Sequence, residues 1–268
     1  MLNARRNKLI TTGLILAALT PLGLQAEESK NVSDAIGPGD SDSKWVLGAY
    51  AGNASEVYAG EGDTGFITPN IEYRGEYFFV SDGDIGFNLF RYNGFSTGLL
   101  LTGEATVLID EDDYDDNAEL AGLEERDLTL DAGLYFQYTT DMGQAKLVMT
   151  DEVTGEHGGQ SAYANYTFDL KYQGINLNPV VGVAWSSADT VNHLFGVSSA
   201  ESTATRDAYK GHSAVSLFTG LRARYEITKN WDVDFETLYI RLGDGIKDSS
   251  IVDKDDVVVT ALGFNYNF

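Results

Sequence analysis

The chain has 268 residues, with 41 acidic against 18 basic side chains, a net charge of −23 and no cysteine. This charge argues against nucleic-acid binding and against the capture of anionic substrates. The lack of cysteine excludes disulfides, thiol nucleophiles and cysteine-based metal sites. After the N-terminal segment, no run approaches the ~20 apolar residues that a membrane-spanning helix requires.

The N-terminus has the parts of an export signal. Basic residues precede an apolar segment at 9–19, which is too short to span a membrane, and a small-residue cleavage site ends at Ala26. Residues 1–26 are therefore expected to be a signal peptide. Residues 27–44 are rich in Asp, Ser, Gly and Glu and predict a flexible periplasmic lead-in, followed by one domain over residues 45–268.

From Trp45 onward, short segments of alternating apolar and polar residues are separated by Gly, Asn and Asp turn signals. They predict twelve strands, at residues 45–52, 65–74, 76–81, 85–92, 95–105, 126–139, 144–154, 161–172, 175–186, 213–227, 231–242 and 257–268. The shortness of the third and fourth strands leaves ten strands as an alternative.

The connections alternate between tight turns and long loops. The long loops are residues 53–64, 106–125, 187–212 and 243–256. With both chain ends in the periplasm, every long loop falls outside the cell and every tight turn inside, as in an all-β transmembrane antiparallel β-barrel. Such a barrel has apolar residues toward lipid and a polar lumen, which explains a polar overall composition. Whether loop 187–212 folds into the barrel is left open by the sequence.

The hairpin of residues 213–242 carries the most specific chemistry. With a turn at residues 228–230, its charged side chains share one face, where Arg224 lies opposite Asp234 and Arg222 opposite Glu236. A shift of one residue would move these charges into lipid, at ~2–4 kcal/mol for an arginine near the midplane. The pairs predict either a charge filter in a narrow channel or an ion-paired plug that fills the lumen.

The loop at residues 110–116 is almost entirely acidic. Its aspartates offer oxygen ligands for a weak divalent-cation site that could bridge to lipopolysaccharide: Asp110, Asp112, Asp113, Asp115 and Asp116. The segment lacks the glycine-containing pattern of a calcium-binding loop. A solvated loop tip of mutually repelling charges is the simpler interpretation, and no bound metal or cofactor is predicted.

Catalytic residues are not predicted. His157, followed by two glycines and Ser161, is the one arrangement that invites comparison with outer-membrane hydrolases. Such enzymes need a histidine beside a nucleophile and a third group that orients it. Because no hydrolase motif surrounds His157, a glycine-rich turn explains this segment better.

The last residues of the chain alternate strictly. Leu262, Phe264, Tyr266 and Phe268 share one face of the final strand. An outward apolar face with aromatic residues at its end suits the membrane boundary. Together with Gly263, this pattern resembles the terminal signal that the barrel assembly machinery recognises. It predicts a Gram-negative outer-membrane location, in contact with lipid and lipopolysaccharide.

Several aromatic- and glycine-containing segments also occur in a particular order along the chain. They are residues 69–74 with 77–79, 86–89, 151–159, 193–197 with 208–209, 225–231 and 249–252. In order and spacing they resemble the MipA/OmpV family of outer-membrane proteins, and the resemblance covers residues 45–268.

The resemblance implies a non-enzymatic barrel. It implies a scaffold for peptidoglycan remodelling, with a lytic transglycosylase and a penicillin-binding protein as partners. Other members of the family imply two alternatives, a narrow porin-like channel for small solutes and a surface adhesin that acts through its outer loops. No catalytic residues carry over from the family to this chain.

Overall fold

The computed structural model describes residues 45–81, 83–104 and 117–268. The predicted signal peptide and lead-in, together with the acidic loop at 110–116, lie outside the described residues. Among the described helices, none is long and apolar enough to cross a membrane.

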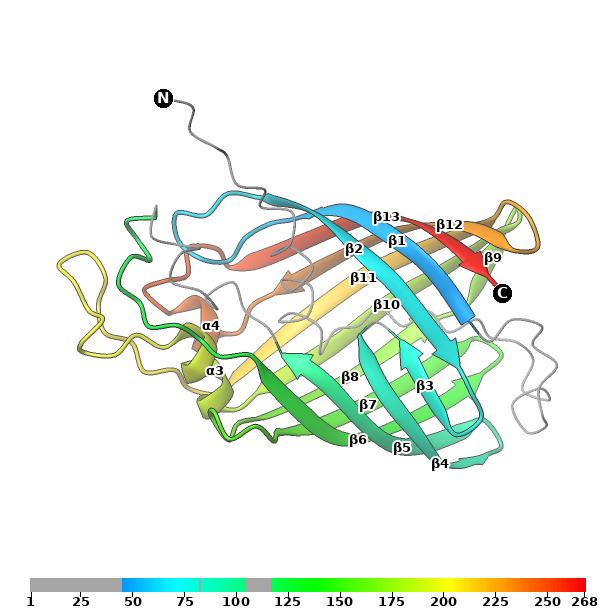
Figure 1. Ribbon diagram of the computed structural model, residues 1–268, viewed down its shortest axis with the longest axis horizontal. Helices are drawn as coiled ribbons and strands as arrows, with labels where there is room; N and C mark the ends of the chain where they lie inside the picture. The colour runs from blue at the N-terminus through cyan, green and yellow to red at the C-terminus, as the bar shows by residue number, and fades with distance from the viewer. Residues whose placement is uncertain (1–44, 82, 105–116) are drawn as a thin grey trace.

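The strands form one antiparallel sheet that closes on itself (Figure 1). They are β1 (Trp45–Ala54), β2 (Thr64–Arg74), β3 (Phe78–Ser81), β4 (Asp84–Tyr92), β5 (Phe95–Glu104), β6 (Thr129–Thr140), β7 (Gly143–Glu152), β8 (Gln160–Phe168), β9 (Leu170–Tyr172), β10 (Ile175–Ser186), β11 (Ala214–Glu226), β12 (Trp231–Arg241) and β13 (Asp256–Asn267). Pairing of β13 with β1 and of β10 with β11 completes the ring.

β8 and β9 are two parts of one strand. Both pair with β10 in a single continuous register, on either side of Pro179. Proline has no backbone N–H to donate to the ladder, so the regular pairing is interrupted there. The Asn178 side chain instead donates to the Phe168 carbonyl, at 3.1 Å. Counted this way, the barrel has twelve strands, which confirms the sequence prediction over the ten-strand alternative.

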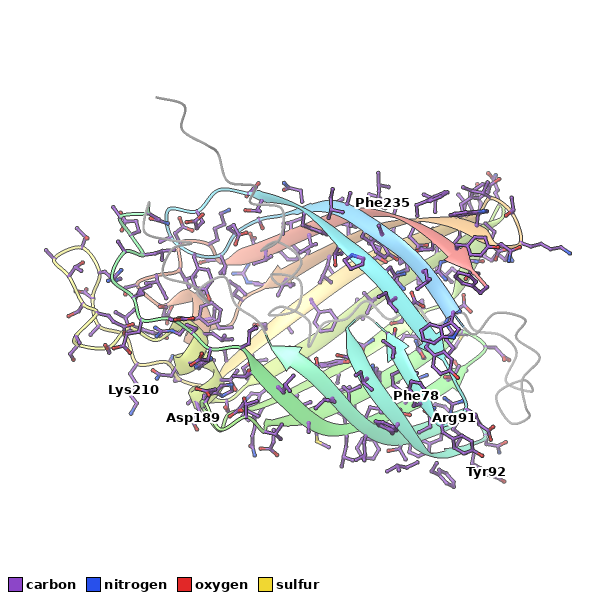
Figure 2. All side chains as sticks on the ribbon, in the orientation of Figure 1. Phe78, Arg91, Tyr92, Asp189, Lys210 and Phe235 are labelled. Atoms are coloured by element: carbon purple, nitrogen blue, oxygen red, sulfur yellow. The ribbon has the colours of Figure 1, made fainter. Side chains whose placement is uncertain are left out.

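Side chains along each strand face lipid and lumen in turn. On β11, Leu217 is 56% exposed and its neighbour Phe218 only 6%. On β13, Leu262 is 59% exposed and Ala261 only 5%. The labelled Phe235 and Phe78 lie on the outside of the wall (Figure 2). A one-residue shift in register would reverse both faces, and for this reason the pattern specifies the pairing.

The two ends of the barrel differ. One end, here called the turn end, carries the C-terminus and the tight connections that follow β2, β4, β6, β9 and β11 (Figure 1). Two of its turns have positive φ at both central residues: Asn93 (50°) with Gly94 (77°), and Gln173 (50°) with Gly174 (83°). These angles are those of the hairpin turn whose twist matches that of the adjoining strands.

The opposite end, here called the loop end, carries the long loops and two short helices, α3 (Ala188–Phe195) and α4 (Asp244–Lys247). The buried apolar residues of these loops and helices form one cluster with buried apolar residues of the strands. Those contributed by the loops and helices are Val57, Tyr58, Leu120, Leu123, Val191, Leu194, Phe195, Val197, Leu242, Ile246 and Ile251. We call this packed layer the outer cap. It places residues of loop 187–212 in the core, which the sequence had left open.

Candidate functional site

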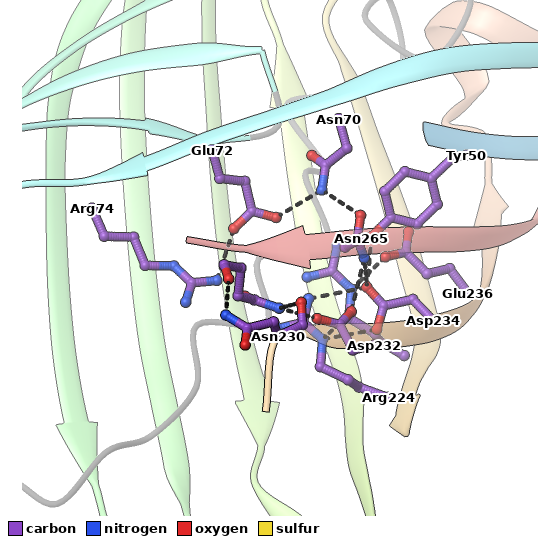
Figure 3. A network of polar contacts seen from close by, with 12 residues as sticks. Tyr50, Asn70, Glu72, Arg74, Arg224, Asn230, Asp232, Asp234, Glu236 and Asn265 are labelled. Atoms are coloured by element: carbon purple, nitrogen blue, oxygen red, sulfur yellow. Dashed lines mark hydrogen bonds and ion pairs between the residues drawn. The ribbon is translucent and has the colours of Figure 1, made fainter. Parts of the chain in front are cut away.

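A connected group of polar side chains occupies the lumen toward the turn end (Figure 3). Its centre is the carboxylate of Asp234 on β12, whose side chain is fully buried. Arg224 on β11 donates to both oxygens of this carboxylate, at 2.8 Å from Nε and 3.0 Å from Nη2. The Tyr50 hydroxyl on β1 donates to the same carboxylate at 2.7 Å. Two parallel N–H···O bonds give this pair a defined geometry as well as a charge balance.

The group continues across the barrel through asparagine amides. Asn265 Nδ2 donates to Asp232 at 2.9 Å and to Asp234 at 3.1 Å. Its Oδ1 accepts from Asn70 Nδ2 at 3.0 Å, and Asn70 also donates to Glu72 at 3.1 Å. Glu72 in turn accepts from Arg74 at 2.8 Å. β11, β12, β13, β1 and β2 are therefore joined by one hydrogen-bonded chain, which we call the lumen network.

The close packing of the network depends on a glycine. A Cβ added to Gly48 on β1 would lie 2.1 Å from Asn265 Oδ1 and 2.5 Å from the Phe264 carbonyl oxygen. A larger residue at this position would push the amide of Asn265 out of the network. Glycine permits this close approach of backbone to side chain.

The charged residues singled out in the sequence lie in this network. Arg224 lies opposite Asp234 and Arg222 opposite Glu236 in the β11–β12 register, and an ion pair joins each couple. Sequence reasoning missed Tyr50, Asn70 and Asn265, which carry the network to other strands. The alternation of side chains along each strand indicates that these three residues face inward. Nothing in the sequence shows that their side chains come close to one another.

Between the lumen network and the loop end, apolar and aromatic side chains line part of the lumen. These buried residues come from nearly every strand: Tyr50, Phe66, Leu100, Tyr135, Val148, Tyr163, Val180, Phe218, Leu238 and Val259. Buried polar side chains such as Asp131, Lys146 and Thr150 share the inward face with them, so the lumen is mixed and includes aromatic residues beside the expected polar ones. Glycines on the inward face make room for some of these rings. Phe79 contacts Gly86, and Phe218 contacts Gly182.

Hydrogen bonds between loops hold the outer cap together. The buried Arg206 donates to the carbonyl oxygens of Glu119 at 2.9 Å and of Ala121 at 3.1 Å. Its Nη2 also donates to the Glu201 carbonyl at 2.6 Å. The Tyr58 hydroxyl donates to the Leu194 carbonyl at 3.2 Å. These four hydrogen bonds to backbone carbonyl oxygens hold residues of the long loops together at the loop end.

Glu201 is the charged centre of the cap. Its carboxylate accepts from the backbone of Glu124 at 2.9 Å, from that of Ser198 at 2.7 Å and from Arg126 at 3.2 Å. Burial alone would raise the pKa of Glu201, but the two backbone donors and the arginine outweigh it and hold the pKa below its usual range. The carboxylate is thus the form that stabilises the cap.

Acid should therefore loosen the cap. A lowered folded-state pKa contributes stability above the unfolded value of about 4.3 and loses it as pH falls through the folded value. Hydrogen exchange at the Ser198 and Glu124 amides, corrected for intrinsic rates, should show protection that is constant at neutral pH and falls below about pH 4.3. Glu201→Gln keeps an acceptor oxygen but cannot titrate, so its protection should not change over this range. A pH-independent wild type would contradict the assignment.

Histidines approach each other at the loop end. His157 and His193 stack with ring centroids 4.6 Å apart, and Gly159 N donates to His157 Nδ1 at 2.9 Å. His193 Nε2 lies 3.3 Å from the Asp127 carbonyl oxygen. The stacked rings join the connection that follows β7 to α3 at the loop end.

The C-terminal aromatic residues lie on the lipid side of β13. Phe264 stacks on Trp231 of β12 with centroids 4.7 Å apart, and Tyr266 meets the same indole edge-on at 4.8 Å. Phe268 N donates to the Trp45 carbonyl at 3.0 Å, which joins the end of the chain to the start of β1. The terminal segment thus completes the closing seam of the barrel.

Comparison with known proteins agrees with this architecture. The family model described as "MltA-interacting protein MipA" matches residues 47–268. The chain belongs to this family.

Relatives of this MipA-family chain are outer-membrane proteins. It is 24% identical to outer membrane protein Omp26La of Vibrio anguillarum, over 85% of this chain and 88% of that protein. It is 27% identical to OmpV of Vibrio cholerae, over 74% and 77%. It is 24% identical to the MltA-interacting protein of Escherichia coli, over 88% and 95%. The chain is accordingly a Gram-negative outer-membrane β-barrel, with its turn end in the periplasm.

Proposed function

We propose that this protein is a non-enzymatic scaffold at the periplasmic face of the outer membrane. Its partners would be peptidoglycan-remodelling enzymes, namely a lytic transglycosylase held together with a penicillin-binding protein. The name of the Escherichia coli relative, MltA-interacting protein, supports a partner of the first kind. The observation that carries the proposal is that, among the described residues, the inward side chains of the lumen network and of the outer cap are buried.

A porin-like channel would need free charges along an open path. Here Arg222 and Arg224 are bound to carboxylates on the neighbouring strand, and aromatic side chains fill the lumen above them. The outer cap then closes the loop end with packed apolar residues. This construction favours a rigid support over an axial pore, and it leaves the periplasmic turns as the surface that soluble envelope enzymes can reach.

The turn end offers contacts suited to a protein partner. Tyr77 is 73% exposed and Met142 is 72% exposed, each within or beside a tight turn. Basic side chains at Arg91, Lys171 and Lys229 are also exposed at this end, and Arg91 is visible beside Tyr92 in Figure 2. Exposed apolar residues ringed by charge are typical of protein-binding surfaces.

The proposal is tested by affinity capture of the tagged full-length protein after crosslinking in intact envelopes. Capture of a lytic transglycosylase or penicillin-binding protein, above an unrelated barrel control, is the expected result. The triple variant Arg91→Glu, Lys171→Glu and Lys229→Glu should lower this capture by about tenfold, or 1.4 kcal/mol. Lys210→Glu, a charge reversal in an outer loop (Figure 2), is the matched control and should leave it unchanged.

Two outcomes would count against a scaffold. Recovery of assembly machinery alone would remove the partner on which the proposal rests. Ion conductance of the purified barrel that changes on neutralising Arg222 or Arg224 would favour the narrow channel instead, because only an open lumen passes ions across those side chains.

A further inference from the structure

The loop that joins β1 to β2, residues 55–63, is bound into the outer cap through its backbone. Ala59 N donates to the Ile251 carbonyl oxygen at 2.9 Å. In the opposite direction, Asp253 N donates to the Val57 carbonyl oxygen at 3.3 Å. Both bonds connect this loop, here called the β1–β2 loop, to the segment between α4 and β13. The loop can therefore leave the cap only when these bonds break.

Glu56 is a buried acid within this loop. Its side chain belongs to a residue that is only 4% exposed, and its Oε1 atom has no hydrogen-bond partner among the described residues. Glu201 is buried in the same cap, but its carboxylate accepts two backbone hydrogen bonds and one from an arginine. An ionised carboxylate at position 56 therefore carries a desolvation cost that hydrogen bonds do not fully offset, whereas the neutral acid carries much less.

The charged groups around Glu56 are mostly acidic. The anions of the β1–β2 loop and of the segment packed against it are Glu61, Asp63, Asp253 and Asp255. Lys254 is the cation that acts on Glu56, but its ammonium group is bound to Asp63 at 3.1 Å. On the third segment that contacts the loop, Asn117 is uncharged and donates to Glu61 at 2.8 Å. The surroundings therefore add repulsion to the cost of burying a charge.

These surroundings shift the ionisation of Glu56. Burial, together with the charges of Glu61 and Asp63, raises its pKa above the usual value, although Thr64 and Lys254 act in the opposite direction. When the loop leaves the cap, the side chain becomes hydrated and its pKa returns to about 4.3. A carboxyl with a raised pKa in the closed state stabilises that state fully below the open-state value, and the stabilisation is lost as pH rises through the raised value.

We infer that Glu56 is a pH-dependent switch, which holds the β1–β2 loop in the outer cap while its carboxyl is protonated and favours release of the loop when it ionises. Glu201 acts in the opposite sense, because the cap requires its carboxylate form. The cap is therefore closed most tightly in mildly acidic solution. As the medium outside the cell becomes neutral, the β1–β2 loop leaves the cap more readily.

The switch is tested by hydrogen exchange of the full-length protein in phosphatidylcholine vesicles, between about pH 5 and 8. Protection of the Ala59 amide, corrected for intrinsic rates, should fall as pH rises, by at most about tenfold per pH unit because one proton is lost. Glu56→Gln cannot ionise and should stay protected throughout. The Leu134 amide, within β6, reports on the barrel wall and should not change. Ala59 protection that does not vary with pH, or that varies equally in Glu56→Gln, would overturn the inference.

Two neighbouring charges distinguish a titrating switch from a residue that only fills space. Glu61→Gln removes a negative charge and keeps the acceptor for Asn117, so the loss of Ala59 protection should be smaller and end at a lower pH. Lys254→Met removes the positive charge, so the loss should be larger and extend to a higher pH. These opposite shifts require that Glu56 itself titrates. Shifts in one direction for both variants, or no shift, would contradict the switch even if Glu56→Gln failed to fold.

Release of the loop is measured separately by thiol labelling. Because the chain has no cysteine, Val57→Cys places a single thiol at a position that is buried in the cap. Ala204→Cys, in an exposed part of loop 187–212, is the control for the effect of pH on the reagent. The ratio of their maleimide labelling rates should rise with pH, and Glu56→Gln should abolish the rise. A constant ratio in the protein with Glu56 intact would show that ionisation does not open the cap and would overturn the inference.

Discussion

Replacement of Asp234 by alanine should lower the free energy of unfolding by up to about 3–5 kcal/mol, since the buried Arg224 loses both hydrogen bonds to that carboxylate and keeps only the longer 3.6 Å ion pair with Asp232. The variant also removes the acceptor of the Tyr50 hydroxyl and of one Asn265 bond. Urea unfolding in detergent micelles, followed by tryptophan fluorescence, measures the change. The barrel should still close, because backbone hydrogen bonds between the strands are untouched.

Two controls test whether burial causes the effect. Arg224→Met with Asp234→Leu removes both charges and should recover part of the lost stability, because the apolar pair has no desolvation cost while the buried Asp232 loses its ion pair with Arg224. Asp63→Ala breaks the exposed ion pair with Lys254 and should cost at most about 1 kcal/mol. If Asp234→Ala were no worse than Asp63→Ala, the lumen network would be hydrated, and a channel would become the better proposal.

Deletion of Phe268 should prevent most of the protein from reaching its folded form in cells. The terminal residue belongs to the segment that resembles the assembly signal, and its ring is 54% exposed on the lipid side. Within the fold it adds one backbone bond to Trp45 and an edge-on contact with Tyr266 at 4.8 Å. A hydrogen bond of this kind contributes about 1 kcal/mol, too little to unfold a barrel.

The deletion thus separates recognition from stability. The heat-modifiable, folded band in outer-membrane fractions should nearly disappear, while the purified variant should refold in detergent with almost unchanged stability. Phe235→Ala removes another lipid-facing aromatic and should assemble normally. Normal assembly of the deletion variant, or an equal loss in refolding, would contradict a signal role for Phe268.

Much of the barrel follows from local patterns. The period-two alternation placed strands such as 175–186 and 231–242 within a residue of their observed ends, because one face must meet lipid and the other must not. Asn93 and Gly94 mark a turn, since few residues tolerate positive φ. The opposition of Arg224 and Asp234 follows from one hairpin and its turn, both of which are short-range features.

Features that join distant strands could not be derived in this way. Tyr50 meets Asp234, and Asn70 meets Asn265, only because closure of the sheet pairs β1 with β13 and so brings β1 and β2 near β12. The sequence predicts that such residues face inward, but it contains no distance between them. The aromatic zone of the lumen was likewise missed, because alternation distinguishes two faces without showing how far rings reach across the interior.

The sequence by itself determined the fold class, the strand count, the lipid-facing side chains and the charged hairpin, because each depends on neighbours within one or two strands. The tertiary structure alone decided that long loops pack into the outer cap, that polar residues from five strands form one network, and that β3 stops early beside β2. These depend on ring closure and on strand lengths relative to one another. The local periodicity of the sequence contains neither the closure of the barrel nor the relative lengths of its strands, so these features arise only in the folded protein.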